Sequence, residues 1–226
     1  MLDLYTWPAP NGHKVNILVE ELETPYRLFP VDITSGDQHK PAYLAINPNG
    51  KIPAIVDHAP ADGGPPLRVF ETGAILLYLA EKAGRFIPAA ARERQEVLQW
   101  LFWQVGGLGP MMGQAQHFFR YAPAPVPYGI DRYQAETRRL LRVLDEQLNG
   151  REFICDTYSI ADMACFPWVR IHKMTGVGLE DFANLRRWYG IVRRRPAVGR
   201  GLDLLRESWV DVTTSDRAKQ NLFQKR

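Results

Sequence analysis

Cysteine is scarce in this sequence, whose 226 residues include only Cys155 and Cys165. Two cysteines cannot build a disulfide framework, and their spacing is typical of neither a zinc site nor a redox pair. The five histidines likewise lack the spacing of metal ligands, such as His-Glu-x-x-His. We therefore expect a reduced, cytoplasmic setting and no bound metal.

Charge of one sign and membrane-compatible runs are also missing. The formal net charge of +3 is too small to indicate a nucleic-acid partner. Residues 97–119 carry no charged side chain, but their glutamines, glycines and Pro110 disfavour a lipid-facing helix. The start of the chain lacks the basic and apolar regions of a signal peptide. We therefore expect a soluble protein that binds neither a membrane nor nucleic acid.

The first part of the chain alternates strand-like and helix-like segments. Short apolar runs predict four strands, over residues 2–6, 26–31, 54–57 and 67–70. Apolar residues at helical spacing predict helices over residues 10–22, 41–46 and 72–82. This order predicts an α/β domain in which helices cover both faces of a mixed four-stranded sheet.

Strand signals stop after Gly84, and the rest of the chain is predicted to be helical. The predicted helices cover residues 91–118, 129–149, 159–174 and 182–194, followed by a shorter one. We place the first domain at residues 1–84, an all-helical domain at 90–206 and a polar surface tail at 207–226. Ser159 and Asp162 have the spacing of a capping box, which indicates a folding signal for a buried helix rather than a catalytic pair.

Asn11 marks the first place where the sequence suggests chemistry. It follows Ala9 and Pro10, where the first strand gives way to the first helix. A helix N-terminus presents free N–H groups and a partial positive charge, which favour an anion such as a thiolate. The amide of Asn11 would add a donor there. The alternative is that Asn11 is only a capping or turn residue.

A proline that leads into the third strand marks the second place. Pro53 cannot donate to the sheet, and a cis Ile52–Pro53 bond would turn the backbone of Ile52 outward. That backbone could pair with a peptide-like ligand as an added strand does. Lys51 beside it could take a carboxylate. The alternative is an ordinary turn.

Glu71 and Thr72 form the third place, at the start of another predicted helix. Glu71 could hold an ammonium group, while the hydroxyl and N–H of Thr72 hold a carboxylate. Together they would bind the zwitterionic end of an amino acid. The alternative is a capping threonine with an unrelated glutamate.

Taken together, these features resemble the glutathione transferase superfamily, and four runs resemble its Nu class. That class includes bacterial glutathione-dependent disulfide-bond oxidoreductases and is similar to the globular part of a yeast nitrogen-regulating prion protein. The resemblance implies a thioredoxin-like N-terminal domain, an all-α C-terminal domain and a homodimer. The four runs are Ala9-Pro-Asn-Gly12, the segment from Asn49 to Gly64, the segment from Phe70 to Lys82 and the segment from Gln99 to Met111.

The resemblance also implies a role for each candidate residue toward glutathione. Asn11 would contact the sulfur as the catalytic residue, and the backbone of Ile52 would pair with the cysteinyl part. The γ-glutamyl end would be held by Glu71 and Thr72, and the glycyl carboxylate by Gln38 and Lys51. Arg132 matches a position that reaches a ligand from the partner subunit, and Gln104 is a weaker assignment of this kind. This chain has Ala9 where many bacterial members have a threonine hydroxyl near the sulfur. The yeast-like members share the alanine, and Thr6 or Tyr5 could substitute for that hydroxyl.

The absence of cysteine from the first domain shapes the expected reaction. Because that domain has no thiol of its own, glutathione must supply the sulfur as a co-substrate. We expect glutathione-dependent reduction of small disulfide substrates. The alternatives are conjugation to electrophiles, hydroperoxide reduction, and a glutathione-binding regulatory protein with little catalysis.

Overall fold

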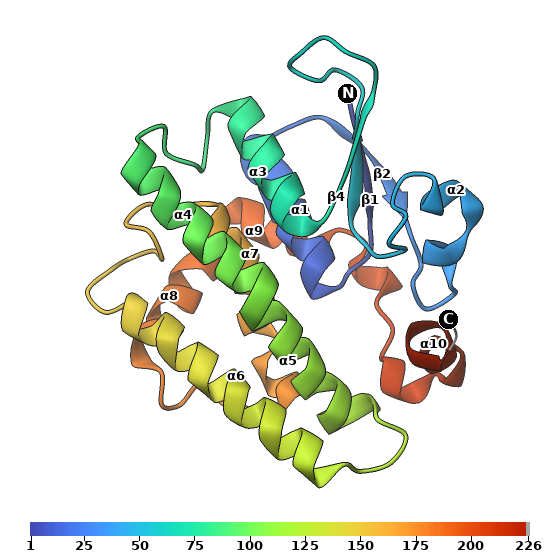
Figure 1. Ribbon diagram of the computed structural model, residues 1–226, viewed down its shortest axis with the longest axis vertical. Helices are drawn as coiled ribbons and strands as arrows, with labels where there is room; N and C mark the ends of the chain where they lie inside the picture. Colours follow the sequence, from blue (N-terminus) through green and yellow to red (C-terminus); the bar gives the residue numbers. More distant parts are fainter. Residues whose placement is uncertain (225–226) are drawn as a thin grey trace. The chain divides into compact units, whose positions relative to one another are not determined.

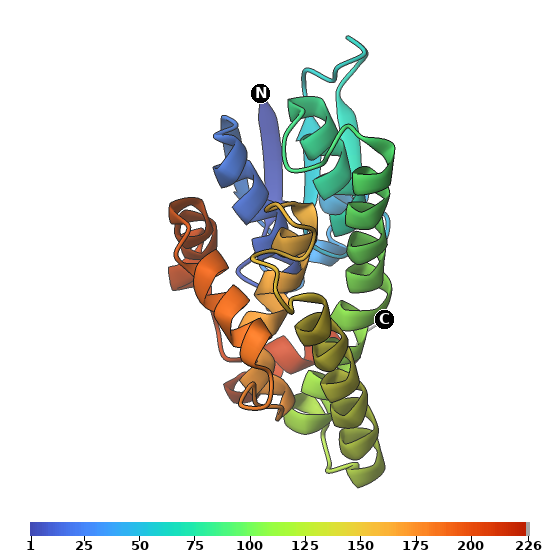
Figure 2. The same cartoon turned by 90° about the vertical axis from the view of Figure 1, so that its left-hand side faces the viewer.

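The computed structural model describes residues 1–224, with side chains up to Phe223. Its internal contacts divide the chain into two compact units (Figures 1 and 2). The first unit contains Met1–Ala83 together with the chain from Ala197 onward, and the second contains Gly84–Pro196. An α/β unit and a helical unit are what the sequence predicts, and the fold class is confirmed.

The first unit is built on a sheet of four strands in the order β2-β1-β3-β4. The strands are β1 (Leu2–Thr6), β2 (Tyr26–Pro30), β3 (Ala54–Asp57) and β4 (Leu67–Phe70). β1 pairs in parallel with β2 and antiparallel with β3, which pairs antiparallel with β4. The predicted mixed sheet is therefore confirmed, and the one difference in its strand bounds is that β2 ends at Pro30 rather than Val31.

Helices cover both faces of this sheet, as predicted. On one side, α1 (Pro10–Leu22) and α3 (Thr72–Ala83) pack against each other (Figure 1). Leu4 and Ile55, which pair across β1 and β3, are fully buried. Successive side chains of a strand point to opposite faces. Tyr5 and Ala54 therefore face the other side, where they pack with Tyr43 of the short helix α2 (Pro41–Leu44). The loop before α2 contains a short 3-10 helix, η1 (Asp37–His39).

The second unit consists of helices throughout its regular structure within the described residues. They are α4 (Ala91–Trp103), η2 (Gln104–Leu108), α5 (Gly109–Gln116), η3 (His117–Tyr121), α6 (Pro127–Gln147), α7 (Ile160–Arg170), η4 (His172–Thr175) and α8 (Ala183–Arg193). The single helix predicted over residues 91–118 contains the π-helical segments η2 and η3. At the end of η2, a Cβ on Gly109 would lie 2.8 Å from Nε2 of Gln104, so a glycine lets that amide come close.

The chain from α9 (Pro196–Asp203) onward returns to the first unit. Arg200 of α9 pairs with Glu20 of α1, with 2.6 Å between Nε and Oε2. A Cβ on Gly201 would lie 2.8 Å from the backbone of Ile17, so α9 packs directly on α1. The segment expected as a surface tail continues with η5 (Arg206–Ser208), η6 (Val212–Thr214), α10 (Asp216–Lys219) and η7 (Gln220–Gln224). Among residues 1–224, no helix is both long and apolar enough to cross a bilayer.

Candidate functional site

The strand registers bring four loops to one edge of the sheet. Thr6 at the end of β1 pairs with Pro30 at the end of β2. Ala54 at the start of β3 pairs with Tyr5 on one side and with Phe70, the end of β4, on the other. The segments that leave the sheet at this edge carry six of the predicted site residues, which are Asn11, Gln38, Lys51, Ile52, Glu71 and Thr72.

The start of α1 is not closed by a side chain. Ala9 is its N-cap residue and makes no side-chain cap bond, and Pro10 is the first helical residue. Asn11 is therefore the second residue of the helix, and the capping interpretation of Asn11 is wrong. The backbone N–H of Gly12 has no acceptor among the residues that the structure describes. A helix end of this kind favours an anion.

Glycine is required after Asn11 because the first turn of α1 closely approaches the preceding strand. A Cβ on Gly12 would lie 2.2 Å from the carbonyl oxygen of Trp7 and 2.7 Å from Oγ1 of Thr6. Thr6 itself is fully buried, and its hydroxyl has no partner within the described residues. Tyr5 stacks on Phe29, with 4.8 Å between the ring centroids. Asn11, by contrast, is partly exposed.

The loop before β3 presents its backbone to solvent. The Ile52–Pro53 peptide bond is cis, the form that the functional interpretation of this proline requires. The carbonyl oxygen of Lys51 accepts hydrogen bonds from the Tyr43 hydroxyl and from Nδ2 of Asn47, each at 2.6 Å. The N–H and C=O of Ile52, which is only partly buried, have no partner within residues 1–224. The loop is thus fixed on one side of Ile52 and leaves the backbone of Ile52 available to an extended chain.

Burial of Tyr43 keeps its hydroxyl available as a hydrogen-bond donor to the loop. Burial raises the pKa of Tyr43 to about 12, so the hydroxyl keeps its proton and donates at any physiological pH. A permanent donor on the Lys51 carbonyl holds the peptide plane that precedes Ile52.

Glu71 and Thr72 follow β4 in an unusual backbone arrangement. Glu71 has a φ of 69°, and its carboxylate accepts from Nδ2 of Asn49 at 3.3 Å. α3 begins at Thr72, so Thr72 is not the cap residue of the helix. Its hydroxyl instead accepts from Nζ of Lys14 at 3.3 Å. The interpretation of Thr72 as a capping threonine is therefore wrong.

Lys14 was not among the predicted site residues, although it is only 2% exposed and lies in α1 beside Thr72. A buried ammonium group is costly unless nearby groups stabilise it, which makes this position chemically notable. Its place in the sequence, among the polar residues of an amphipathic helix, gives no signal that distinguishes it.

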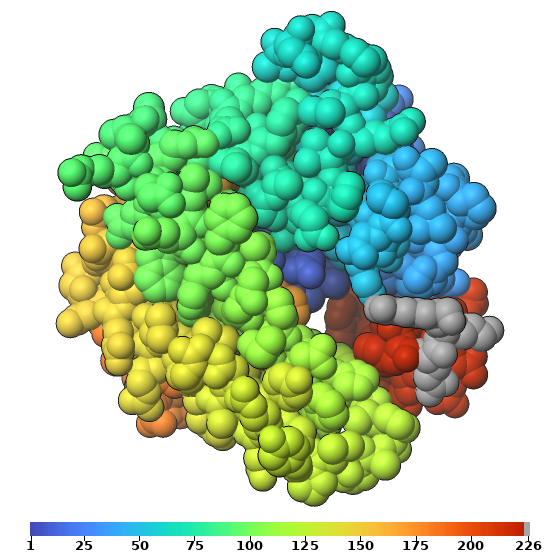
Figure 3. All heavy atoms as spheres, in the orientation of Figure 1, coloured from blue at the N-terminus to red at the C-terminus, as the bar shows by residue number. Residues whose placement is uncertain are grey.

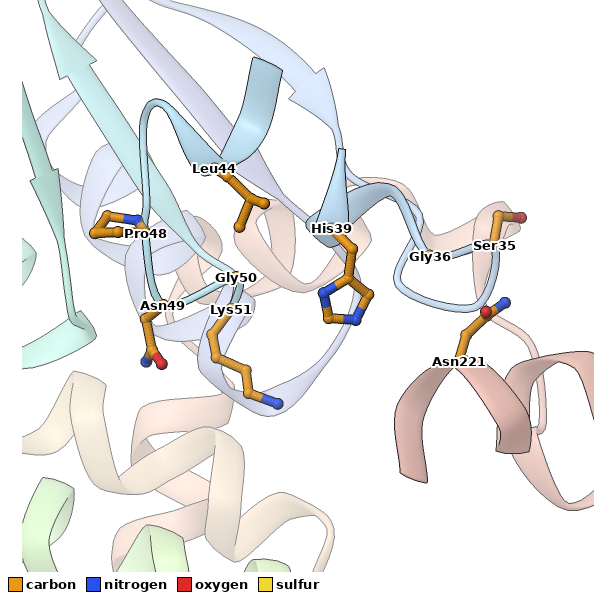
Figure 4. A pocket seen from close by; sticks show the side chains of 9 residues that line it. All are labelled: Ser35, Gly36, His39, Leu44, Pro48, Asn49, Gly50, Lys51 and Asn221. Atoms are coloured by element: carbon orange, nitrogen blue, oxygen red, sulfur yellow. The ribbon is translucent and has the colours of Figure 1, made fainter. Parts of the chain in front are cut away.

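A cavity of about 660 Å³ lies beside Lys51 (Figure 4). Figure 4 shows His39 and Lys51 on one side of it and Asn221 on the other. Gln38, predicted to face a carboxylate, is 3% exposed and donates from Nε2 to the carbonyl of Ile33 at 3.4 Å. The cavity-lining residues are Ser35, Gly36, His39, Leu44, Pro48, Asn49, Gly50, Lys51 and Asn221. Sequence reasoning missed His39 and Asn221, since no motif includes them.

Gln104 and Arg132 belong to the second unit. Gln104 is fully buried at the start of η2, and Arg132 is exposed on α6. Their part in the site stays a prediction. The described residues contain no group of three or more His, Cys, Asp or Glu side chains that could hold a metal.

Fold and site together define a class. A thioredoxin-like sheet followed by helices, with a cis-proline loop and two helix starts at one edge, is the architecture of a glutathione-binding transferase. Family models agree: residues 1–81 match the N-terminal domain of glutathione S-transferase, and residues 129–196 match its C-terminal domain. The chain belongs to the glutathione transferase family.

Individual relatives point the same way. The chain is 53% identical over 203 residues to the disulfide-bond oxidoreductase YfcG of Escherichia coli, which covers 89% of this chain and 94% of the relative. A Burkholderia graminis glutathione transferase with two glutathione molecules per subunit has a TM-score of 0.85 and 46% identity, over 89% of this chain and 87% of that one. A Pseudomonas putida transferase with one glutathione disulfide per subunit has a TM-score of 0.85 and 41% identity, over 90% and 91% of the two chains.

Proposed function

We propose that this protein is a glutathione-dependent disulfide-bond reductase that uses bound glutathione as its thiol nucleophile. The observation that carries the proposal is the unpaired backbone of Ile52 between a cation, Lys51, and the acidic Glu71 at the neighbouring strand end. A short peptide with free ends fits such an arrangement, since its backbone would pair with Ile52. The name of the E. coli relative supports the reaction.

For each part of glutathione, the site offers a protein group of complementary chemistry. The cysteinyl backbone would pair with Ile52, and the γ-glutamyl end would lie at Glu71 and Thr72. Nζ of Lys14 donates to the Thr72 hydroxyl, so a further donor lies near where the γ-glutamyl carboxylate would bind. The glycyl carboxylate would face Lys51 and the loop that carries Gln38.

The start of α1 would stabilise the glutathione thiolate. Lowering a thiol pKa by one unit takes about 1.4 kcal/mol of preferential stabilisation of the thiolate. A helix N-terminus contributes about 0.3–1 kcal/mol, and more when it is partly buried. Asn11 would donate a further hydrogen bond to the sulfur, and two such contributions together reach the required amount.

The reaction then proceeds by two exchanges. The bound thiolate attacks one sulfur of a disulfide and forms a mixed disulfide, and the released thiolate takes up a proton. A second glutathione thiolate attacks the mixed disulfide at the glutathione sulfur. This gives glutathione disulfide and the second substrate thiol, so two glutathione thiols are oxidised as one disulfide is reduced. The relatives that hold two glutathione molecules or one glutathione disulfide support this stoichiometry.

The proposal includes assignments finer than the family. We place the protein in the Nu class and propose a cytoplasmic homodimer in which Arg132 of the partner subunit and Gln104 assist the site. Within the described residues, Cys155 and Cys165 are buried and form no disulfide, as a reducing compartment allows.

Turnover of hydroxyethyl disulfide with glutathione tests the function. The wild-type protein should reduce this disulfide, and Asn11→Ala should lower kcat about 10-fold through loss of a hydrogen bond to the thiolate. Asn149→Ala, the same substitution in an exposed turn, is the matched control and should leave kcat unchanged. No disulfide turnover beside robust activity on an aryl halide or a hydroperoxide would instead establish conjugation or peroxide reduction. Glutathione binding without turnover of any of these substrates would favour a regulatory protein. The lack of a side-chain hydroxyl at Ala9 is the reason for considering this alternative.

A further inference from the structure

The C-terminal segment of residues 211–224 is folded onto the first unit. Asp211 accepts from the N–H of Thr213 at 3.0 Å, and Ser215 caps α10 by accepting from the N–H of Ala218 at 3.2 Å. Ala218 is fully buried. These caps and this burial hold the segment in a defined place and give it a role that a free tail would not have.

Asn221 joins this segment to the loop after β2. Its Nδ2 donates to the carbonyl oxygen of Thr34 at 2.8 Å. Its Oδ1 lies 3.3 Å from where a Cβ on Gly36 would be, and Gly36 has a φ of +87°, which favours glycine. Figure 4 shows Asn221 reaching toward Ser35 and Gly36 from the C-terminal helix.

The loop that Asn221 contacts is ordered by its own hydrogen bonds. The carboxylate of Asp32 accepts from the hydroxyls of Thr34 and Ser35, each at 2.6 Å. Burial raises the pKa of Asp32, but these hydroxyls and the backbone N–H groups outweigh it and hold the pKa below its ordinary value. Gly36 is the N-cap residue of η1, which carries Gln38 and His39.

The cavity beside this loop suits an anionic ligand end. Lys51 and His39 line it, and none of its lining residues is acidic among those that the structure describes. The proposed glutathione site places the glycyl carboxylate at Lys51. Asn221 forms the opposite wall of the same cavity (Figure 4).

We propose that Asn221 is a positioning residue for the glycyl end of glutathione, an inference that rests on the proposed function. By binding Thr34 and packing on Gly36, it fixes the loop that presents η1 to the cavity. The C-terminal segment is then part of the glutathione site, and its contribution is specific to ligands that carry the glycyl carboxylate.

The test compares two ligands on two variants of the full-length protein. Calorimetry gives the Kd of glutathione and of γ-glutamylcysteine, which lacks the glycyl residue. Asn221→Ala should weaken glutathione about 3–10-fold, the equivalent of one lost hydrogen bond, and leave γ-glutamylcysteine unchanged. Asn221→Asp should weaken glutathione further, because its carboxylate repels the Thr34 carbonyl and the ligand. The KM for glutathione should rise while kcat stays constant, and Asn149→Ala should change neither.

Two results would overturn this inference while the proposed function stands. One is an unchanged Kd of glutathione in both Asn221 variants. The other is an equal loss of affinity for the two ligands, which would show a general structural role. A wild-type protein that binds neither ligand would overturn the proposed function itself.

Discussion

Two helix N-termini, one in each unit, share a backbone geometry and differ in chemistry. Ala9, the N-cap of α1, has φ −131° and ψ 161°, and Ser159, the N-cap of α7, has φ −143° and ψ 177°. Ser159 closes its helix with a complete capping box, confirming the prediction from the sequence. Ala9 has no side chain with which to do so. The same extended conformation therefore gives a closed end in one unit and an end open to an anion in the other.

Asp162 shows how completely the second helix start is satisfied. Its side chain is fully buried and accepts from the N–H groups of Ile154, Ser159 and the Trp188 indole, and from the Ser159 hydroxyl. Burial raises the pKa of Asp162 to about 6, against the opposing effect of these donors. The hydrogen bonds to Asp162 stabilise the fold, whereas the start of α1 leaves backbone N–H donors for a ligand.

The largest expected effect comes from breaking the closed end. Asp162→Asn presents an amide N–H₂ to buried donors, and we expect a loss of about 3–5 kcal/mol in the free energy of unfolding. Urea denaturation measures it. Because the folded pKa lies above the ordinary 3.8, the stabilisation by wild-type Asp162 is complete below about pH 4 and declines as the pH rises through about 6. The difference between the two proteins should shrink over that window, and a difference that grows would contradict this.

A second buried carboxylate, in the first unit, should respond to pH in the opposite sense. Burial raises the pKa of Asp57, but Lys82 and the Tyr78 hydroxyl, 2.6 Å from Oδ2, outweigh it and hold the pKa below 3.8. Its stabilisation is therefore present above about pH 4 and lost as the pH falls below it. Asp57→Asn should cost about 1 kcal/mol at neutral pH, since Lys82 is partly exposed.

Urea denaturation of wild type and Asp57→Asn at about pH 7 and pH 3 measures this effect. The two proteins should converge at the lower pH. A gap that persists there would show that Asp57 acts through packing rather than charge, and would remove the contrast with Asp162.

The strands, the helical second part and the capping box were predictable because each depends on local pattern. Short apolar runs placed the strands, and Ser159 with Asp162 placed the start of α7 within one residue. The π-helical turns at Gln104 and His117 were not predictable, since α-helical and π-helical turns share an apolar pattern over so few residues.

The candidate site was predictable where a residue's chemistry lies in its own neighbourhood. The cis bond before Pro53 is such a case. Lys14, His39 and Asn221 were missed because their roles depend on contacts with distant segments: Lys14 with Thr72, and Asn221 with Thr34. The alternative interpretation of Thr72 as a cap is wrong because α3 begins at Thr72 itself, which puts the cap position one residue earlier.

The smallest expected effect, Ala9→Ser, closes the open helix end. Because Ala9 already has the extended conformation of Ser159, the new hydroxyl can accept from a first-turn N–H without backbone change, and should add about 0.5–1 kcal/mol to the free energy of unfolding. The same hydroxyl would compete with the glutathione sulfur for the backbone N–H donors of the first turn of α1. The apparent thiol pKa in the pH profile of kcat/KM should therefore rise, by at most about one unit. A fall in that pKa would mean that the serine hydroxyl donates to the sulfur, as the threonine of related enzymes is expected to do. The thiolate would then be stabilised by a side chain at the start of α1 rather than by the unpaired N–H groups of the helix.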